Sequence, residues 1–219
     1  MNRLALFDCD GTLVDSQAAI CRAMDDCFAE LGLVPPDRHR VRRIVGLSLM
    51  EAMRALVPGG DHALHRALTD SYKLAFQRHR GAGLVEEPLF DGIAEALDAL
   101  AASGWLLGVA TGKSDRGLKL CLERHGLAGH FITLQTADRH PSKPDPSMLH
   151  AAMAEAGSGP ATTVMIGDTV FDMAMAVTGG AHALGVDWGY HDAAELKAAG
   201  ARAVAVTAAD LPGWLEQMA

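Results

Sequence analysis

The stretch that decides the fold lies near the start of the chain and reads Leu4-Ala5-Leu6-Phe7-Asp8-Cys9-Asp10-Gly11-Thr12-Leu13-Val14-Asp15-Ser16. An apolar run leads directly into two carboxylates that one residue separates. Because side chains alternate along an extended chain, Asp8 and Asp10 point to one side and Cys9 to the other. A buried carboxylate needs a charged partner or a metal ion, and two hard oxygen ligands suit Mg²⁺. Taken alone, the stretch fits equally well a strand that ends in an Asp-Gly turn.

The composition is that of an ordinary globular protein. The chain has 219 residues, of which 49% are hydrophobic and 21% charged, which suits one large domain or a domain with a smaller insert. A formal net charge of -8 disfavours a nucleic-acid partner, and no basic cluster indicates membrane binding. The cysteines form neither a CxxC pair nor a zinc spacing, so we expect core residues in a reducing compartment. The first apolar run is too short for a signal peptide or a membrane span, so we expect a cytoplasmic protein.

Short apolar runs alternate with helical patterns through most of the chain. The runs cover residues 4–7, 106–110, 131–134, 163–166, 181–186 and 204–206. The helical patterns cover residues 93–102, 116–125, 147–156, 173–177, 193–199 and 211–218. Strands that are apolar on both faces and separated by helices predict an α/β fold with a doubly wound parallel sheet. Such sheets bind their ligands at the carboxyl ends of the strands.

One segment, residues 16–83, lacks any strand pattern. Its apolar residues recur at helical spacing, first around Ile20 and Met24 and again around Leu68 and Tyr72. We therefore predict a small all-helical domain of residues 16–83, inserted after the first strand. The α/β core domain would then consist of residues 1–15 and 84–219.

Polar residues follow the other predicted strands too. The second strand ends in Thr111-Gly112-Lys113, the third is followed by Ser142-Lys143-Pro144, and the fourth runs into Gly167-Asp168 with Asp172 close behind. Four segments thus deliver carboxylates, a hydroxyl and a lysine to one sheet edge. Chemistry on a phosphate needs a nucleophile, a proton donor, a divalent cation and groups that bind the phosphoryl oxygens.

These motifs, in this order, resemble those of the haloacid dehalogenase superfamily. The matching residues are Asp8-x-Asp10-Gly11-Thr12, Thr111, Lys143-Pro144 and Gly167-Asp168-x-x-x-Asp172. The resemblance spans nearly the whole chain, including a helical cap inserted after the first strand. Within the superfamily, the chain is most similar to small phosphatases of the phosphoglycolate phosphatase type. The resemblance therefore implies a Rossmann-like core and a phosphatase that acts on a small phosphorylated metabolite.

The same resemblance implies the catalytic roles. Asp8 would be the nucleophile that forms an aspartyl phosphate, and Asp10 would protonate the leaving alcohol and later activate water. Thr111 would bond a phosphoryl oxygen, helped by the backbone N–H of Gly112. Lys143 would neutralise phosphate charge and keep the nucleophile ionised.

The resemblance also implies a Mg²⁺ site. Asp8, Asp168 and the backbone carbonyl of Asp10 would hold the ion. Asp172 would orient Lys143 or a water bound to the metal. Cys9 replaces the more usual aliphatic residue between the two aspartates, and we expect its side chain to face away from the site.

Several residues keep two interpretations. Asp15 can cap the first cap helix, contact the substrate, or do both. Arg42 and Arg43 belong to a basic stretch that either meets an anionic group of the substrate or forms an exposed basic helix. We interpret Lys113 as structural or solvated rather than catalytic.

Alternative reactions on the same scaffold remain open at this point. A sugar phosphomutase resembling beta-phosphoglucomutase usually carries an arginine after the serine of the cap loop, whereas here Leu49 follows Ser48. A dehalogenase would lack Asp10, because no leaving alcohol needs a proton. A pyrophosphatase is the further alternative. The sequence leaves the choice between a monomer and a homodimer open.

Overall fold

A six-stranded parallel sheet forms the centre of the molecule in the computed structural model, which describes residues 1–219. Its strands are β1 (Asn2–Phe7), β2 (Leu106–Thr111), β3 (Phe131–Thr136), β4 (Ser158–Gly167), β5 (His182–Val186) and β6 (Ala203–Ala205). The strand order is β3-β2-β1-β4-β5-β6, so the chain builds one half of the sheet and then crosses over β1 to build the other. Ligands of such sheets bind where the order reverses, and here that place is the carboxyl end of β1 and β4.

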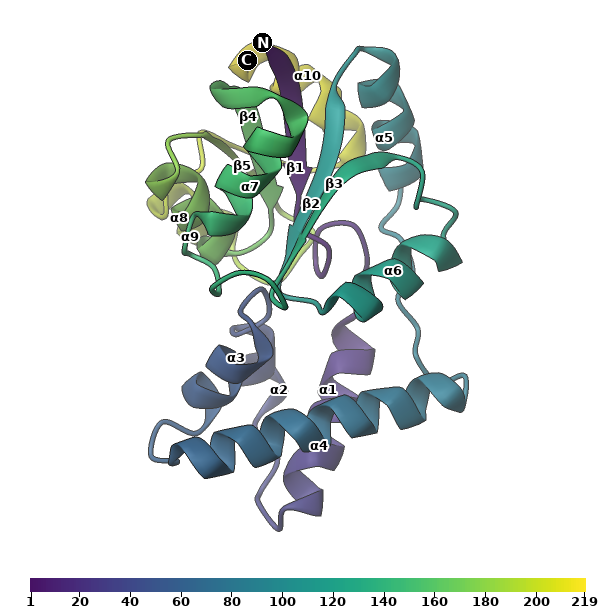
Figure 1. Cartoon of the computed structure of the whole chain (residues 1–219), viewed down its shortest axis with the longest axis vertical. Coiled ribbons are helices and arrows are strands. Elements are labelled where there is room, and N and C mark those ends of the chain that lie inside the picture. The colour runs from purple at the N-terminus through teal and green to yellow at the C-terminus, as the bar shows by residue number, and fades with distance from the viewer.

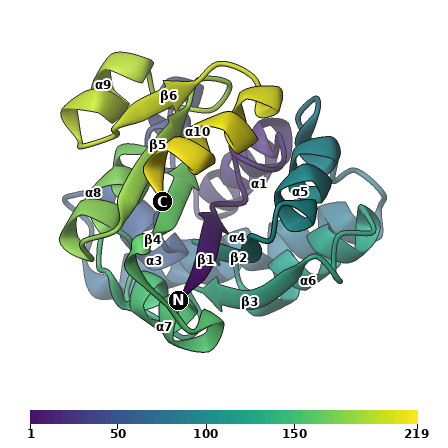
Figure 2. The same ribbon diagram turned by 90° about the horizontal axis from the view of Figure 1, so that it is seen from above.

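Helices cover both faces of the sheet. One face carries α5 (Ile93–Ala102), α6 (Asp115–Arg124) and α10 (Leu211–Met218). A 3₁₀ turn at Ala208–Asp210 directly precedes α10. The other face carries α7 (Ser147–Ala156), α8 (Val170–Thr178) and α9 (Ala193–Ala198). Figure 2 shows these two groups on opposite sides of the strands. The predicted doubly wound α/β fold is confirmed.

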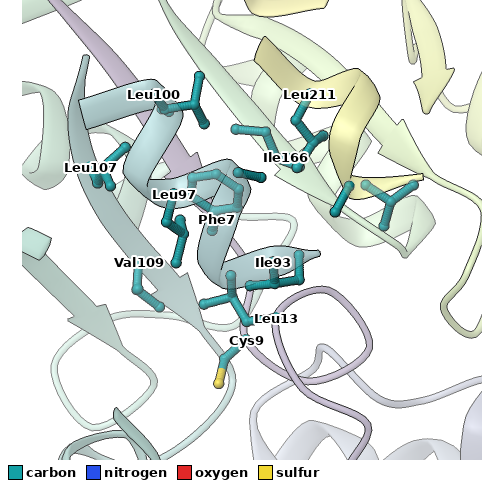
Figure 3. Close-up of a cluster of buried hydrophobic side chains, with 14 of the residues drawn as sticks. Phe7, Cys9, Leu13, Ile93, Leu97, Leu100, Leu107, Val109, Ile166 and Leu211 are labelled. Atoms are coloured by element: carbon teal, nitrogen blue, oxygen red, sulfur yellow. The ribbon is translucent and has the colours of Figure 1, made fainter. Parts of the chain in front are cut away.

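Strand β1 is buried on both faces because apolar residues occupy every position from Leu4 to Phe7. Phe7 packs with residues such as Leu97 and Val109 beneath α5, as Figure 3 shows. Leu4 and Leu6 belong to a second apolar cluster under α7 and α8. Burying each large apolar side chain stabilises the fold by about 1.5–3 kcal/mol. The end of β1 is therefore a rigid position from which to present a carboxylate.

Four helices between β1 and α5 form a separate layer. They are α1 (Gln17–Glu30), α2 (Arg38–Arg42), α3 (Leu49–Leu56) and α4 (His62–Gly81). Figure 1 shows them facing the carboxyl ends of the strands. Their own apolar cluster includes Met24, Phe28, Met53 and Leu68. We call residues 16–83 the cap, and we keep the division into cap and core as a proposal.

The cysteines are all free and buried, and Cys9 lies in the apolar cluster under α5. None of the helices combines the length and the apolar character that crossing a bilayer requires.

Candidate active site

Asp8 follows β1 and is completely buried. Its backbone N–H donates to the carbonyl of Ile166 on β4 at 2.9 Å. Its Oδ1 accepts from the Cys9 N–H at 2.6 Å and lies 3.0 Å from Lys143 Nζ. Its Oδ2 is buried without any hydrogen-bond partner. Burial raises the pKa of Asp8 to about 7, although Lys143 opposes this rise. One carboxylate oxygen of Asp8 is thus left free for a ligand.

Two further buried aspartates stand beside Asp8. Asp168 directly follows β4, and it accepts from the Thr12 hydroxyl at 2.8 Å and from the Tyr190 N–H at 2.9 Å. Asp172 lies in the first turn of α8, where its carboxylate forms a capping box with Thr169. Burial raises the pKa of Asp168, and the neighbouring charges of Asp8 and Asp172 add to the rise.

The three carboxylates form a group that suits a divalent cation. One oxygen from each of Asp8, Asp168 and Asp172 lies within 4.8 Å of the others. Lys143 alone does not balance the charge of the three carboxylates. Gly11 allows the chain to pass this close, because its φ is +85° and a Cβ there would come within 2.2 Å of an Asp168 oxygen. Hard oxygen ligands in a site of net negative charge fit Mg²⁺.

Lys143 lies completely buried between two of these carboxylates. Its Nζ is 2.7 Å from Asp172 Oδ1 and 3.0 Å from Asp8 Oδ1. Burial alone would lower the pKa of Lys143, but Asp172 and Asp8 outweigh this effect and raise it. The ammonium group therefore stays charged. Thr111, at the end of β2, is also buried, and its hydroxyl accepts from the Lys113 N–H at 3.2 Å.

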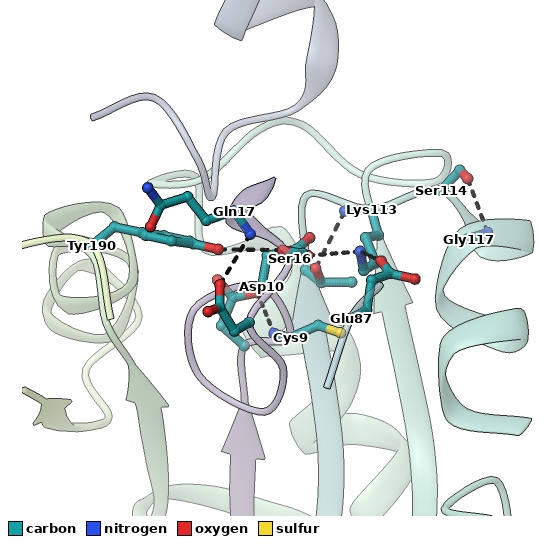
Figure 4. A network of polar contacts seen from close by, with 12 residues as sticks. Cys9, Asp10, Ser16, Gln17, Glu87, Lys113, Ser114, Gly117 and Tyr190 are labelled. Carbon is teal, nitrogen blue, oxygen red and sulfur yellow. Dashed lines mark hydrogen bonds and ion pairs between the residues drawn. The ribbon is translucent and has the colours of Figure 1, made fainter. Parts of the chain in front are cut away.

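The side chain of Asp10 belongs to a different network, which Figure 4 shows. Its Oδ1 accepts a short hydrogen bond from the Ser16 hydroxyl and lies 2.6 Å from Lys113 Nζ. The ammonium group of Lys113 also contacts Glu87 at 2.7 Å. Lys113 has a side chain only 10% exposed, so of the two predicted alternatives, structural or solvated, the solvated one was wrong. The Tyr190 hydroxyl lies 3.3 Å from the Ser16 hydroxyl and completes the network.

Sequence reasoning did not find Glu87, Tyr190 or Thr12 as residues of the site. Glu87 and Tyr190 lie outside the strand-end motifs, and each reaches the site only through the fold. Thr12 did carry a signal, because it stands directly after Asp10-Gly11 on the same edge.

Asp15 and Gly112 occupy less central positions. The Asp15 side chain is exposed and accepts from the Gln17 N–H at 3.1 Å, at the start of α1. Ser16 is the residue at the cap position of α1, but its side chain makes no capping bond. Gly112 touches the cap, since a Cβ there would lie 2.5 Å from the Leu47 carbonyl oxygen.

Arg42 and Arg43 connect the cap to the core. Arg43 pairs with Glu195 through two contacts of 2.5 and 2.9 Å. The Arg42 guanidinium lies 5.9 Å from the centre of the Tyr190 ring, and one N–H reaches the Gly189 carbonyl at 3.4 Å. Neither arginine bonds to the carboxylates of the site. Both are partly buried, which differs from an exposed basic helix.

Comparison with known proteins shows the family to which this chain belongs. The family model of haloacid dehalogenase-like hydrolases matches residues 5–186. The chain belongs to this family. It is 36% identical to a probable phosphatase IndB of Dickeya dadantii over 97% of this chain and 93% of that protein. It is 31% identical to a phosphoglycolate phosphatase of Rhodospirillum rubrum, over 98% of this chain and 91% of that one.

A solved structure agrees with the fold. The crystal structure of a predicted phosphatase from Clostridium acetobutylicum matches with a TM-score of 0.88 and 26% identity, covering 99% of both chains. The expected family and the enzyme class, a phosphatase, are confirmed. The roles of individual residues stay predictions.

Proposed function

We propose that this protein is a Mg²⁺-dependent phosphatase that hydrolyses a small phosphomonoester, such as phosphoglycolate, through an aspartyl phosphate on Asp8. The observation that carries the proposal is the free Oδ2 of Asp8. This oxygen is buried at the strand end beside Lys143, while Oδ1 is held by two donors. A carboxylate held on one side and free on the other is prepared for attack on phosphorus.

In the first step, Asp8 Oδ2 forms a bond to phosphorus while the bond from phosphorus to the ester oxygen breaks. Asp10 gives its proton to the departing alkoxide, so a neutral alcohol leaves. In the second step, Asp10 takes a proton from a water molecule whose oxygen attacks phosphorus. The bond between phosphorus and Asp8 Oδ2 then breaks, and inorganic phosphate leaves.

The other residues bind and neutralise the phosphoryl group. Lys143 offsets its charge, and Asp172 holds Lys143 in place. Thr111 and the Gly112 N–H would donate to phosphoryl oxygens. Asp8, Asp168 and the Asp10 carbonyl would hold Mg²⁺, which supplies Lewis-acid polarisation of the phosphoryl group when bound.

The cap loop supports hydrolysis over phosphoryl transfer to a second hydroxyl. A mutase must keep water out and hold a bisphosphate intermediate, which requires cationic anchors. Leu49 stands where a mutase usually has an arginine. The free, buried cysteines support work in a reducing compartment such as the cytoplasm.

The substitution Asp8→Asn tests the proposal, because it keeps the shape of the side chain and removes the attacking charge. We expect kcat for phosphate release to fall by at least about 10³-fold while thermal melting shows an intact fold. Asp91→Asn, an exposed aspartate of the core, is the matched control. A folded Asp8→Asn protein with normal turnover would refute the proposal. Conversion of glucose 1-phosphate to glucose 6-phosphate with little free phosphate would instead indicate a mutase.

A further inference from the structure

A large cavity lies between the cap and the carboxyl edge of the sheet. Its volume is about 830 Å³, and its core side is formed by residues of the catalytic edge, among them Asp10, Gly112 and Lys113. The cavity therefore reaches Asp10, the residue that we propose to protonate the leaving alcohol. Pockets of roughly 300–1,000 Å³ hold ligands of the size of a drug or cofactor. The glycolyl part of phosphoglycolate has only a handful of non-hydrogen atoms and would leave most of this space empty.

Part of the cap side of the cavity is an apolar and aromatic wall. Ile20 and Met24 of α1 contribute aliphatic side chains, as does Val45 of the cap loop. Tyr72 and Phe76 of α4 contribute two rings whose centres lie 5.9 Å apart with a tilt of 35°. These rings stand one helical turn apart, so both face the cavity. Such a wall favours a flat apolar group, since aromatic rings bury large area in preferred tilted or stacked arrangements.

Polar residues of α4 also line the cavity, namely Thr69, Lys73, Gln77 and Arg80, and Thr69 is the one of them that is buried. The Thr69 side chain lines the cavity, its residue is only 6% exposed, and its hydroxyl has no hydrogen-bond partner. A buried hydroxyl without a partner costs free energy, which a ligand group would recover by bonding to it. Tyr72 lies one turn further along the same face of α4, and burial raises the pKa of its phenol, which therefore stays protonated.

We infer that, if the proposed function holds, the natural substrate is a phosphomonoester whose alcohol carries a planar ring with a hydrogen-bonding group. The ring lies against Tyr72 and Phe76, and its polar group bonds to the Thr69 hydroxyl. The phosphate stays at Asp8, and the ester oxygen stays near Asp10. Nucleoside 5′-monophosphates have this chemistry, and so do phosphorylated alcohols of substituted heteroaromatic rings. The inference narrows the substrate class away from phosphoglycolate.

A panel of phosphate esters with Mg²⁺ tests the inference. Benzyl phosphate and ethyl phosphate both release a primary alcohol, so their comparison isolates the ring. AMP and UMP add polar groups on the ring, and pyridoxine 5′-phosphate presents a substituted ring without a sugar. We expect kcat/KM for the ring-bearing esters to exceed that for ethyl phosphate and phosphoglycolate by about tenfold or more. The inference would be overturned if the enzyme hydrolysed phosphoglycolate with the same kcat/KM as every ring-bearing ester.

Variants of the cavity wall add a second comparison. Phe76→Ala should lower the preference for benzyl over ethyl phosphate by about tenfold. If the alanine variant does not fold, Phe76→Leu replaces it in the comparison, because it removes the ring and keeps most of the apolar volume. Thr69→Val should lower kcat/KM for the polar-ring esters by about tenfold and affect benzyl phosphate less. Leu74→Ala is the control, because Leu74 lies on α4, is 56% exposed and does not line the cavity. Equal losses on all esters would contradict the inference.

Binding to Asp8→Asn separates this inference from the proposed function. The variant lacks the attacking charge but keeps the cavity, so calorimetry can measure the Kd of AMP, UMP, pyridoxine 5′-phosphate and phosphoglycolate without turnover. Tighter binding of a ring-bearing ester together with an inactive wild-type enzyme would leave the cavity assignment standing and refute the proposed phosphatase reaction. If the wild-type enzyme releases phosphate but shows no preference for a ring in binding or in turnover, the proposed phosphatase reaction stands and the cavity assignment is refuted.

Discussion

The ammonium nitrogen of Lys113 lies 2.6 Å from a carboxylate oxygen of Asp10, the residue that we propose as general acid and base. The same nitrogen contacts Glu87, which follows the cap and is paired at 3.0 Å with Arg80 of the last cap helix. Burial alone would raise the pKa of Glu87, but Lys113 and Arg80 outweigh it and lower that pKa. A chain of alternating charges thus runs from the end of the cap to Asp10 and fixes the position of its carboxylate.

Lys113→Met should therefore weaken the proton transfer to the leaving group. We expect kcat/KM for an alkyl phosphate such as benzyl phosphate to fall by about 10–100-fold. The loss for p-nitrophenyl phosphate should be much smaller, because its leaving group needs little protonation. Lys119→Met, an exposed lysine of the neighbouring helix α6, is the control. If kcat/KM falls by the same factor for both esters, Lys113 has no specific effect on Asp10.

Removal of the metal should abolish turnover. Activity should vanish with a chelator and return with Mg²⁺, whereas Ca²⁺ should inhibit because its higher and looser coordination misplaces the nucleophile. Asp168→Asn should raise the Mg²⁺ concentration needed for half-maximal activity by about 10–100-fold. Its fold is checked by thermal melting without metal, where loss of one of the crowded buried charges should leave Tm at pH 8 near or above that of the wild type. Full activity after exhaustive chelation would contradict the metal assignment.

The stability of the metal-free protein should fall as pH rises toward neutrality. The pKa of Asp8 is about 7 in the folded protein and 3.8 in its unperturbed state, so the folded state holds the proton more tightly. The contribution of Asp8 to stability is therefore fully present below about pH 4 and is lost as pH rises to about 7.

Mg²⁺ requires the ionised carboxylate, so its effect on Tm should grow with pH. Melts with chelator and with Mg²⁺ at pH 6, 7 and 8 measure this difference. Asp8→Asn should reduce the dependence on pH, since it removes one titrating group, while Asp168, whose pKa burial also raises, keeps the rest. If Mg²⁺ raises Tm by the same amount at all three pH values, the prediction is contradicted.

Substitutions in the ion pair of Arg43 and Glu195 test whether Arg43 holds the cap against the core or selects the substrate. Arg43→Glu should raise KM about two- to fivefold for every ester, because it opens the contact between cap and core. The double variant with Glu195→Arg should recover part of the loss. If Arg43 selects a carboxylate instead, Arg43→Ala should raise KM only for carboxylated substrates such as phosphoglycolate, and the double variant should not recover it.

The sequence by itself determined the sheet, the helices and the strand-end residues of the site. Apolar runs such as 4–7 and 163–166 can be buried on both faces only in a sheet that helices cover, so their pattern predicts the parallel fold. Asp8 and Asp168 follow those strands directly, and parallel strands bring their carboxyl ends to one edge. Local spacing therefore sufficed to predict which carboxylates meet.

The tertiary structure decided what no local pattern encodes. From the sequence alone, Lys113 cannot be told from a surface lysine. The fold brings Asp10 and Glu87 into contact with its ammonium group. Arg43 reads as part of a basic face until the cap docks and Glu195 of α9 meets it. The cavity and its unpaired Thr69 exist only because α4 of the cap lies across from the sheet edge. Each of these features depends on side chains that are far apart in the sequence, and their contacts follow from how the cap packs on the core.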